Sequence, residues 1–317
     1  MLKNIPKIEL HLHLDGSLDI DYIKEKYGLS NEDIKNKMIA DEKCIDLNDY
    51  LTKFDYPLSI MQTKEELINS TKNLISKLIS QNVKYAEIRF APQLHTRKKL
   101  TQDEVVKTVI DASKNNDIKI NFILCFMRGN NNEKANLETL EVAYKYLNKG
   151  VCAVDLAGAE GLYPTKNYED LFMRVNEYHI PFTIHAGEAD GIESIKAAIK
   201  FGAKRIGHGV RVIDDISLVK YLVDNDITLE ICPTSNIQTC ICDSYHNHPL
   251  RDLYKMGVKT TINTDNMTVS NTCLLNEYEH ILEETDLTEE DIINMNINAI
   301  NAAFISTEEK IELFKLY

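Results

Sequence analysis

The sequence predicts an α/β fold in which about eight parallel strands alternate with helices and close into a (β/α)8 TIM barrel. Three observations support this: short apolar runs recur along the chain, helical patterns separate them, and 317 residues suffice for one barrel. We expect strands at residues 7–14, 85–90, 118–127, 151–157, 180–185, 205–208, 227–232 and 258–264. An open, doubly wound sheet is the alternative, but no Gly-rich phosphate-binding loop follows any of these runs.

Apolar residues at helical spacing fill the segments between the expected strands. The clearest case is 64–79, where Leu67, Leu74, Ile75 and Leu78 share one helical face. Further helices are expected at 102–115, 133–147, 168–178, 191–201 and 216–225, and beyond residue 274 at the C-terminus. Neither a linker-like composition nor an internal repeat interrupts the chain, so we expect a single domain over residues 1–317.

A long helical insertion separates the first two expected strands. Around Tyr50, Leu51, Phe54 and Leu58 it has an apolar side that we expect to cover the mouth of the barrel. Ordinary packing of a peripheral helix is the alternative explanation of the same residues.

Composition limits the classes of partner. The chain is 44% hydrophobic and 27% charged, which is typical of a globular protein, and its net charge of −13 argues against nucleic acid or an anionic membrane. No apolar run reaches the ~20 residues of a membrane span, and residues 1–14 do not resemble a signal peptide. Seven cysteines with scattered spacing suit free thiols in a reducing compartment. We therefore expect a cytoplasmic protein with a small-molecule partner; the oligomeric state stays open.

Two histidines lie in the first expected strand. Residues two apart in a strand point to the same side, so His11 and His13 share one face while Leu10, Leu12 and Leu14 share the other. Two imidazoles on one face can bind one metal ion. A pair of surface histidines on an edge strand is the alternative.

The fifth expected strand ends in His185-Ala186-Gly187-Glu188, where Gly187 allows a sharp turn between an imidazole and a carboxyl group. Active sites of such barrels lie at the C-terminal ends of the strands. Polar residues and glycines gather at these ends: His11, His13, Gly158, His185, Glu188, His208 and Asp265. Asp265 alone would also fit a capping carboxylate.

Three histidines and a carboxylate are ligands suited to zinc, with room left for a water molecule. Zinc lowers the pKa of a bound water from 15.7 toward about 7, so hydroxide is supplied at neutral pH. Glu188 is not needed as a ligand, and a closed pocket raises the pKa of a carboxyl group. Glu188 is therefore a candidate proton shuttle.

Five motifs together resemble those of the adenosine deaminases, a family of the metal-dependent amidohydrolase superfamily. They are residues 11–17 (HLHLDGS), 185–188 (HAGE), 207–209 (GHG), 232–236 (CPTSN) and 263–265 (NTD). The resemblance implies one zinc ion per chain held by His11, His13, His185 and Asp265. It also implies that Glu188 protonates N1 of the purine, while His208 and Asp265 orient and deprotonate the attacking water. Adenosine or 2′-deoxyadenosine would then yield inosine or deoxyinosine, plus ammonia, as in purine salvage.

The resemblance also implies substrate contacts. Asp15 and His13 match positions that meet the ribose 5′-hydroxyl, and Gly158 matches a backbone contact to the purine. Many members have an Asp where this chain has Asn266, which would donate a hydrogen bond to purine N7 through its amide. Asp15 replaces the longer Glu that is usual in related adenine deaminases, which favours a nucleoside.

Two other functions are alternatives. One is deamination of adenine or another aminopurine, and the other is a purine-binding barrel without catalysis. The second is disfavoured because all of the implied ligands and both proton-transfer residues are present.

A second cluster of potential ligands follows the seventh expected strand. Cys240, Cys242, His246 and His248 lie within nine residues, but structural zinc sites usually have wider, paired spacing. A loop leading into the next helix is therefore favoured over a second metal site. The cytidine-type deaminase pattern of His-x-Glu with Pro-Cys-x-x-Cys does not occur in the chain.

Overall fold

In a computed structural model that describes residues 2–317, eight parallel strands form two four-stranded sheets, ordered β1-β2-β3-β4 and β5-β6-β7-β8. Met1, the first residue of the expected domain, lies outside the described residues. The strands are β1 (Lys7–His13), β2 (Val83–Phe90), β3 (Lys119–Met127), β4 (Val151–Ala157), β5 (His185–Ala186), β6 (Arg205–His208), β7 (Thr228–Ile231) and β8 (Lys259–Ile262).

Backbone hydrogen bonds join the two sheets at both seams. Between β1 and the end of β8, His13 N donates to Asp265 O (2.7 Å) and Asp265 N donates to His11 O (2.9 Å). At the other seam, Val154 N donates to Pro181 O (3.0 Å) and Thr183 N donates to Val154 O (3.1 Å). The barrel is therefore closed, which confirms the predicted fold and excludes the open sheet.

The fifth strand is shorter than predicted. We expected residues 180–185, but regular pairing is confined to His185–Ala186. Pro181 has no N–H to give to a sheet. The approach to β5 makes two bonds to Val154, and Ile184 O accepts one from Gly207 N at 2.9 Å.

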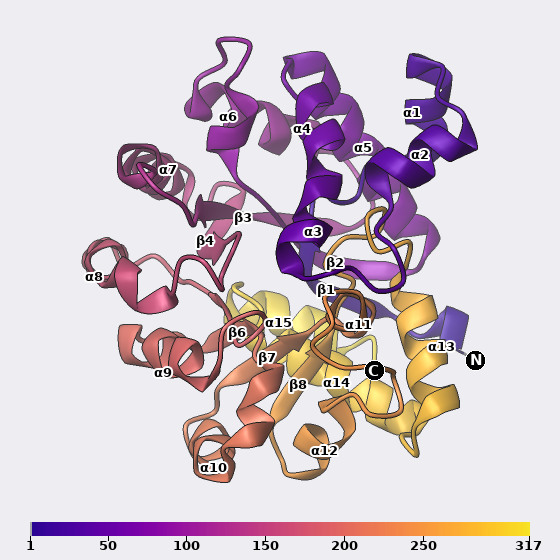
Figure 1. Ribbon diagram of the computed structural model, residues 1–317, viewed down its shortest axis with the longest axis vertical. Helices are drawn as coiled ribbons and strands as arrows, with labels where there is room; N and C mark the ends of the chain where they lie inside the picture. Colours follow the sequence, from indigo (N-terminus) through magenta and orange to yellow (C-terminus); the bar gives the residue numbers. More distant parts are fainter. Residues whose placement is uncertain (1) are drawn as a thin grey trace.

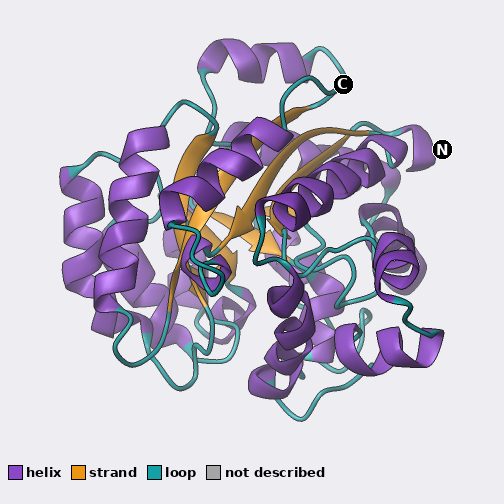
Figure 2. Cartoon of the chain, turned by 90° about the horizontal axis from the view of Figure 1, so that it is seen from above, coloured by secondary structure: helices purple, strands orange, loops and turns teal. Residues whose placement is uncertain are grey.

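Helices surround the barrel, as Figures 1 and 2 show. After β2 to β7 come α6 (Gln102–Ala112), α7 (Glu133–Tyr146), α8 (Glu169–Glu177), α9 (Ile192–Phe201), α10 (Ile216–Asp224), α11 (Pro233–Gln238) and α12 (Leu250–Lys255). The C-terminal helices are α13 (Leu274–Glu284), α14 (Glu289–Ala302) and α15 (Thr307–Phe314). Short 3₁₀ turns lie at Leu2–Asn4, Thr52–Phe54, Pro92–His95, Thr165–Tyr168 and Val210–Asp214. None of the helices in this described part of the chain is long and apolar enough to cross a membrane.

Local sequence fixes where several helices begin. Thr101 begins α6 with a capping box, in which its side chain accepts from the backbone N–H of Glu104 and Glu104 accepts from that of Thr101. Similar boxes begin α14 at Thr288 and α15 at Ser306.

The insertion after β1 contains α1 (Ile20–Tyr27), α2 (Asn31–Met38), α3 (Leu47–Leu51), α4 (Asp55–Ile60) and α5 (Lys64–Ser80). Helix α5 lies on the outer face of the barrel, whereas α3 and α4 extend over the C-terminal ends of the strands and line a cavity there (Figure 1). The predicted apolar cover is confirmed: Tyr50, Leu51, Phe54 and Leu58 all border the cavity.

Candidate active site

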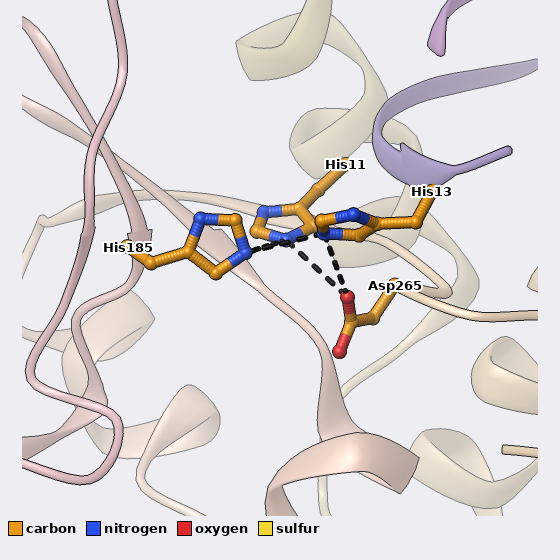
Figure 3. Close-up of side chains that lie close together, drawn as sticks. All are labelled: His11, His13, His185 and Asp265. Carbon is orange, nitrogen blue, oxygen red and sulfur yellow. Dashed lines mark hydrogen bonds and ion pairs between the residues drawn. The ribbon is translucent and has the colours of Figure 1, made fainter. Parts of the chain in front are cut away.

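The barrel brings four predicted ligands to one point, as Figure 3 shows. His11 and His13 come from the end of β1, His185 comes from β5, and Asp265 follows β8. Nε2 of His185 lies 3.1 Å from Nε2 of His11 and 3.2 Å from Nε2 of His13. Oδ1 of Asp265 lies 3.5 Å from Nε2 of His11 and 3.4 Å from Nε2 of His13.

These distances fit a single metal ion. Two ligand atoms about 2.0–2.1 Å from a tetrahedral zinc lie about 3.4 Å apart. Nδ1 of His11 and Nδ1 of His185 each face a carboxylate oxygen, so they carry the ring protons and the Nε2 atoms present lone pairs. Two such lone pairs 3.1 Å apart repel each other, and a shared cation removes this repulsion.

A buried ion-pair network beneath the ligands orients them. Glu230 Oε2 lies 2.9 Å from His11 Nδ1, and Asp155 Oδ2 lies 2.9 Å from His185 Nδ1. Arg89 bridges both carboxylates at 2.8 Å, so the two rings share one anchor. Such outer contacts fix the ring orientation of metal-binding histidines.

Arg205 completes this network by contacting Glu230 and Glu87 at 2.6 Å each. Burial alone would raise the pKa of Glu230, but the guanidiniums of Arg205 and Arg89 hold it well below its usual range. Glu230 therefore remains an anion that accepts from His11.

Sequence reasoning missed this network. The signal was present, because Glu87, Arg89, Asp155 and Glu230 each interrupt a largely apolar strand and Arg205 begins one. All five are fully buried or nearly so, which is unusual for charged residues unless they are paired.

Glu188 lies on a turn just beyond His185, at the cavity wall. The turn is held by Glu160, whose carboxylate accepts from the backbone N–H groups of residues 187–190 at 2.7–3.0 Å. Burial, followed by the charges of Asp265 and Glu160, raises the pKa of Glu188 well above its usual value. A raised pKa favours the protonated form, which is the form that can donate a proton.

His208 and Asp265 both have the left-handed backbone conformation, with φ of 60° and 58°. Non-glycine residues rarely adopt it, and such strain often occurs at functional sites. Ser235 Oγ donates to Asp265 Oδ2 at 2.6 Å, which leaves Oδ1 facing the histidines. Nε2 of His208 lies 3.6 Å from Glu188 Oε2, so His208 and Glu188 share the cavity wall.

The cavity has a volume of about 220 Å³ and contains the remaining predicted substrate-binding residues. Asp15, Gly158 and Asn266 line it together with His13. Burial raises the pKa of Asp15 to about 7. Gly158 has φ of 103°, a conformation that favours glycine and lets the backbone border the cavity directly.

Asn266 makes one contact that the sequence did not predict. Its Nδ2 donates to the hydroxyl of Tyr50 at 2.9 Å, and that hydroxyl lies 2.6 Å from Ser270 Oγ. The insertion therefore orients Asn266 through Tyr50, and one of its two amide protons is already used.

The cysteine and histidine cluster after β7 does not gather into a ligand group among residues 2–317. Cys240 Sγ contacts the backbone oxygen of Cys44, and His246 Nδ1 faces the backbone oxygen of Glu284. His248 instead points inward to Asn236. The segment is the loop that leads into α12.

A closed (β/α)8 barrel with three histidines and an aspartate at the C-terminal ends of its strands defines a hydrolase of the metal-dependent amidohydrolase type. The comparisons with known proteins specify it further. The model of a family described as adenosine deaminase matches residues 6–316. An adenosine deaminase from Haemophilus ducreyi is 44% identical, over 96% of this chain and 93% of its own length. The chain belongs to the adenosine deaminase family and is a hydrolytic deaminase.

Solved structures support the fold. An adenine deaminase from Arthrobacter aurescens has a TM-score of 0.87 at 24% identity, covering 98% of this chain and 97% of its own. A Burkholderia ambifaria amidohydrolase with bound Zn has a TM-score of 0.88 at 18% identity, covering 99% and 90%.

Proposed function

We propose that this chain is a zinc-dependent enzyme that deaminates adenosine and 2′-deoxyadenosine hydrolytically, giving inosine or deoxyinosine plus ammonia. The observation that carries the proposal is the convergence of three histidines, Asp265 and Glu188, whose pKa burial raises, on one cavity. Membership of the adenosine deaminase family supports the reaction. We further propose that residues 1–317 form one catalytic domain that acts in cytoplasmic purine salvage.

His11, His13, His185 and Asp265 would hold one zinc ion per chain. Nitrogen and oxygen ligands at tetrahedral spacing suit zinc, and the related amidohydrolase with bound Zn supports this choice of metal. When bound there, zinc supplies a water of lowered pKa at neutral pH.

The chain's own residues handle the protons. Glu188 would donate to N1 of the purine, which makes C6 more electrophilic. His208 and Asp265 would hold the attacking water and remove its proton as its oxygen adds to C6. The proton removed from the water would then pass to the amino nitrogen as the C6–N bond breaks, so that ammonia leaves, and the proton of the added hydroxyl would return to Glu188 as the C6 carbonyl forms.

The rest of the cavity would recognise the nucleoside. Asp15 and His13 would contact the ribose 5′-hydroxyl, the backbone of Gly158 would contact the purine, and Asn266 would donate to N7. The short Asp15 leaves room for a sugar, and the curated relative at 44% identity is named for adenosine. Both favour adenosine over adenine as the substrate.

The test is an ultraviolet assay of purified protein with adenosine, 2′-deoxyadenosine and adenine, combined with elemental analysis for metal. We expect loss of the adenosine absorbance, about one zinc per chain, loss of activity on chelation, and recovery with added zinc. Zinc-loaded protein that leaves adenosine unchanged would refute the proposal. Faster turnover of adenine would assign the alternative substrate.

A further inference from the structure

A chain of three hydrogen bonds runs from the start of α12 to the cavity, and it determines how His208 is protonated. It begins at the backbone of Leu250, passes through His248 and Asn236, and ends on Nδ1 of His208. All three side chains are buried. The proposed function uses His208 but assigns no role to Asn236 or His248.

The direction of these three hydrogen bonds follows from the first donor. The backbone N–H of Leu250 lies 3.0 Å from Nδ1 of His248 and can only donate, so this Nδ1 must accept. Burial lowers the pKa of His248 to about 3, so its ring is neutral and carries a single proton. That proton is therefore on Nε2.

The same reasoning passes through Asn236. Nε2 of His248 lies 3.2 Å from Oδ1 of Asn236, so the ring donates and the amide oxygen accepts. The amide nitrogen of Asn236 consequently faces His208, with Nδ2 and Nδ1 3.0 Å apart. An amide nitrogen can only donate, so Nδ1 of His208 must be the unprotonated atom.

Nε2 of neutral His208 then carries the ring proton and points toward the reaction centre. This atom has no hydrogen-bond partner among residues 2–317. It lies 3.6 Å from Oε2 of Glu188, and His208, Glu188 and Asp265 each offer one ligand atom within 4.8 Å of the others. The proton is thus available to an oxygen that enters this space.

We propose that Asn236 and His248 are positioning residues that fix His208 as its Nε2–H tautomer, so that His208 donates a hydrogen bond to the oxygen that attacks C6. This inference rests on the reaction proposed above and divides the role given there to His208 and Asp265 jointly: the proton lost by the water goes to the carboxylate of Asp265 alone. His208 stabilises the charge that develops on the attacking oxygen and does not act as its base.

The substitution Asn236→Asp distinguishes His208 as a hydrogen-bond donor from His208 as a base. It replaces the donating amide by an accepting carboxylate with almost no change in shape. A carboxylate at this position accepts from His248 and also from His208, which forces the ring proton of His208 onto Nδ1. If His208 is a donor, kcat should fall on the order of 10²-fold, as for loss of one positioned donor, with little change in KM. If His208 is a base, a carboxylate on Nδ1 should maintain or raise kcat.

Nitrogen-15 NMR of histidine-labelled, zinc-loaded protein reads the tautomer directly and does not depend on activity. We expect His208 with a protonated Nε2 in the unsubstituted protein and a protonated Nδ1 in Asn236→Asp. His248→Phe removes the donor to Asn236, so we expect a mixture of the two tautomers. Asn167→Asp, at an exposed position, is the matched control and should leave tautomer and kcat unchanged.

Two results would overturn the inference. One is a protonated Nδ1 on His208 in the unsubstituted protein, and the other is an Asn236→Asp enzyme with switched tautomer and undiminished kcat. Either result leaves adenosine deamination itself intact. Failure of the proposed function would instead appear as no turnover by the unsubstituted, zinc-loaded enzyme.

Discussion

Replacing Glu160 by Gln should test whether catalysis depends on the position of Glu188 as well as on the presence of its carboxyl group. The Glu160 carboxylate is fully buried and accepts five hydrogen bonds, four from the backbone of residues 187–190 and one from Ser194 Oγ. It therefore holds the turn that carries Glu188. Glu160→Gln keeps the shape but puts an NH₂ group where one oxygen accepted.

The structure sets the size of the effect. If the amide nitrogen replaces Oε1, the N–H of Gly187 loses its acceptor, and if it replaces Oε2, three N–H groups lose theirs. One lost hydrogen bond to a charged group costs about 1.5–3 kcal/mol, which corresponds to a fall in Tm of roughly 2–5 °C. A displacement of the reacting carboxyl by about 1 Å can cost on the order of 10²-fold in rate. We therefore expect kcat to fall at least about tenfold.

The assay combines steady-state kinetics on adenosine, thermal unfolding and metal content. Glu193→Gln, whose side chain is 82% exposed at the start of α9, is the matched control and should behave like the unsubstituted enzyme. A Glu160→Gln protein with unchanged kcat and unchanged Tm would refute the reasoning. A lower Tm with unchanged kcat would limit Glu160 to a structural role.

Three further substitutions test the cavity. Glu188→Gln should retain zinc but lose roughly 10²-fold or more in kcat because it cannot donate the proton; retained kcat would exclude Glu188 as the acid. Asn266→Ala should raise KM for adenosine roughly 2- to 10-fold, the value of one neutral hydrogen bond of about 0.5–1.5 kcal/mol, and unchanged KM and kcat would remove the proposed N7 contact. Phe54→Ala should raise KM with little change in kcat, because Phe54 borders the cavity and has no proposed part in proton transfer; an unchanged substrate affinity would contradict a covering role.

The alternation of apolar runs with helical patterns was enough to predict the barrel, because both periodicities are local properties of the sequence. The start of the fifth strand was less predictable. Ile180-Pro181-Phe182 has the composition of a strand, but the pairing of Pro181 with Val154 depends on a backbone 27 residues earlier in the chain. A local sequence pattern cannot show which backbone groups of this segment find hydrogen-bond partners.

The ligands and Glu188 were predictable because metal-binding and acidic residues lay at strand ends, where a barrel concentrates function. Residues that act by positioning another residue were not predictable from the sequence. Asn236 was part of a noticed motif, yet its contact with His208 depends on α11 lying beside the end of β6. His248 was considered as a ligand of a second metal, and only the fold shows that its ring faces Asn236.

The ion-pair network beneath the cavity has an electrostatic consequence for the choice of ion. Four buried carboxylates, those of Glu87, Asp155, Glu230 and Asp265, face only two guanidiniums, those of Arg89 and Arg205. Glu188 is left out of this count, because burial and the neighbouring charges raise its pKa well above its usual value and so favour its neutral form. Two negative charges therefore remain uncompensated, and an unpaired buried charge costs several kcal/mol.

A dication makes this region electroneutral, whereas a monovalent ion leaves it anionic and a trivalent ion leaves it cationic. We therefore expect substitution among divalent metals to be tolerated better than any change of valence.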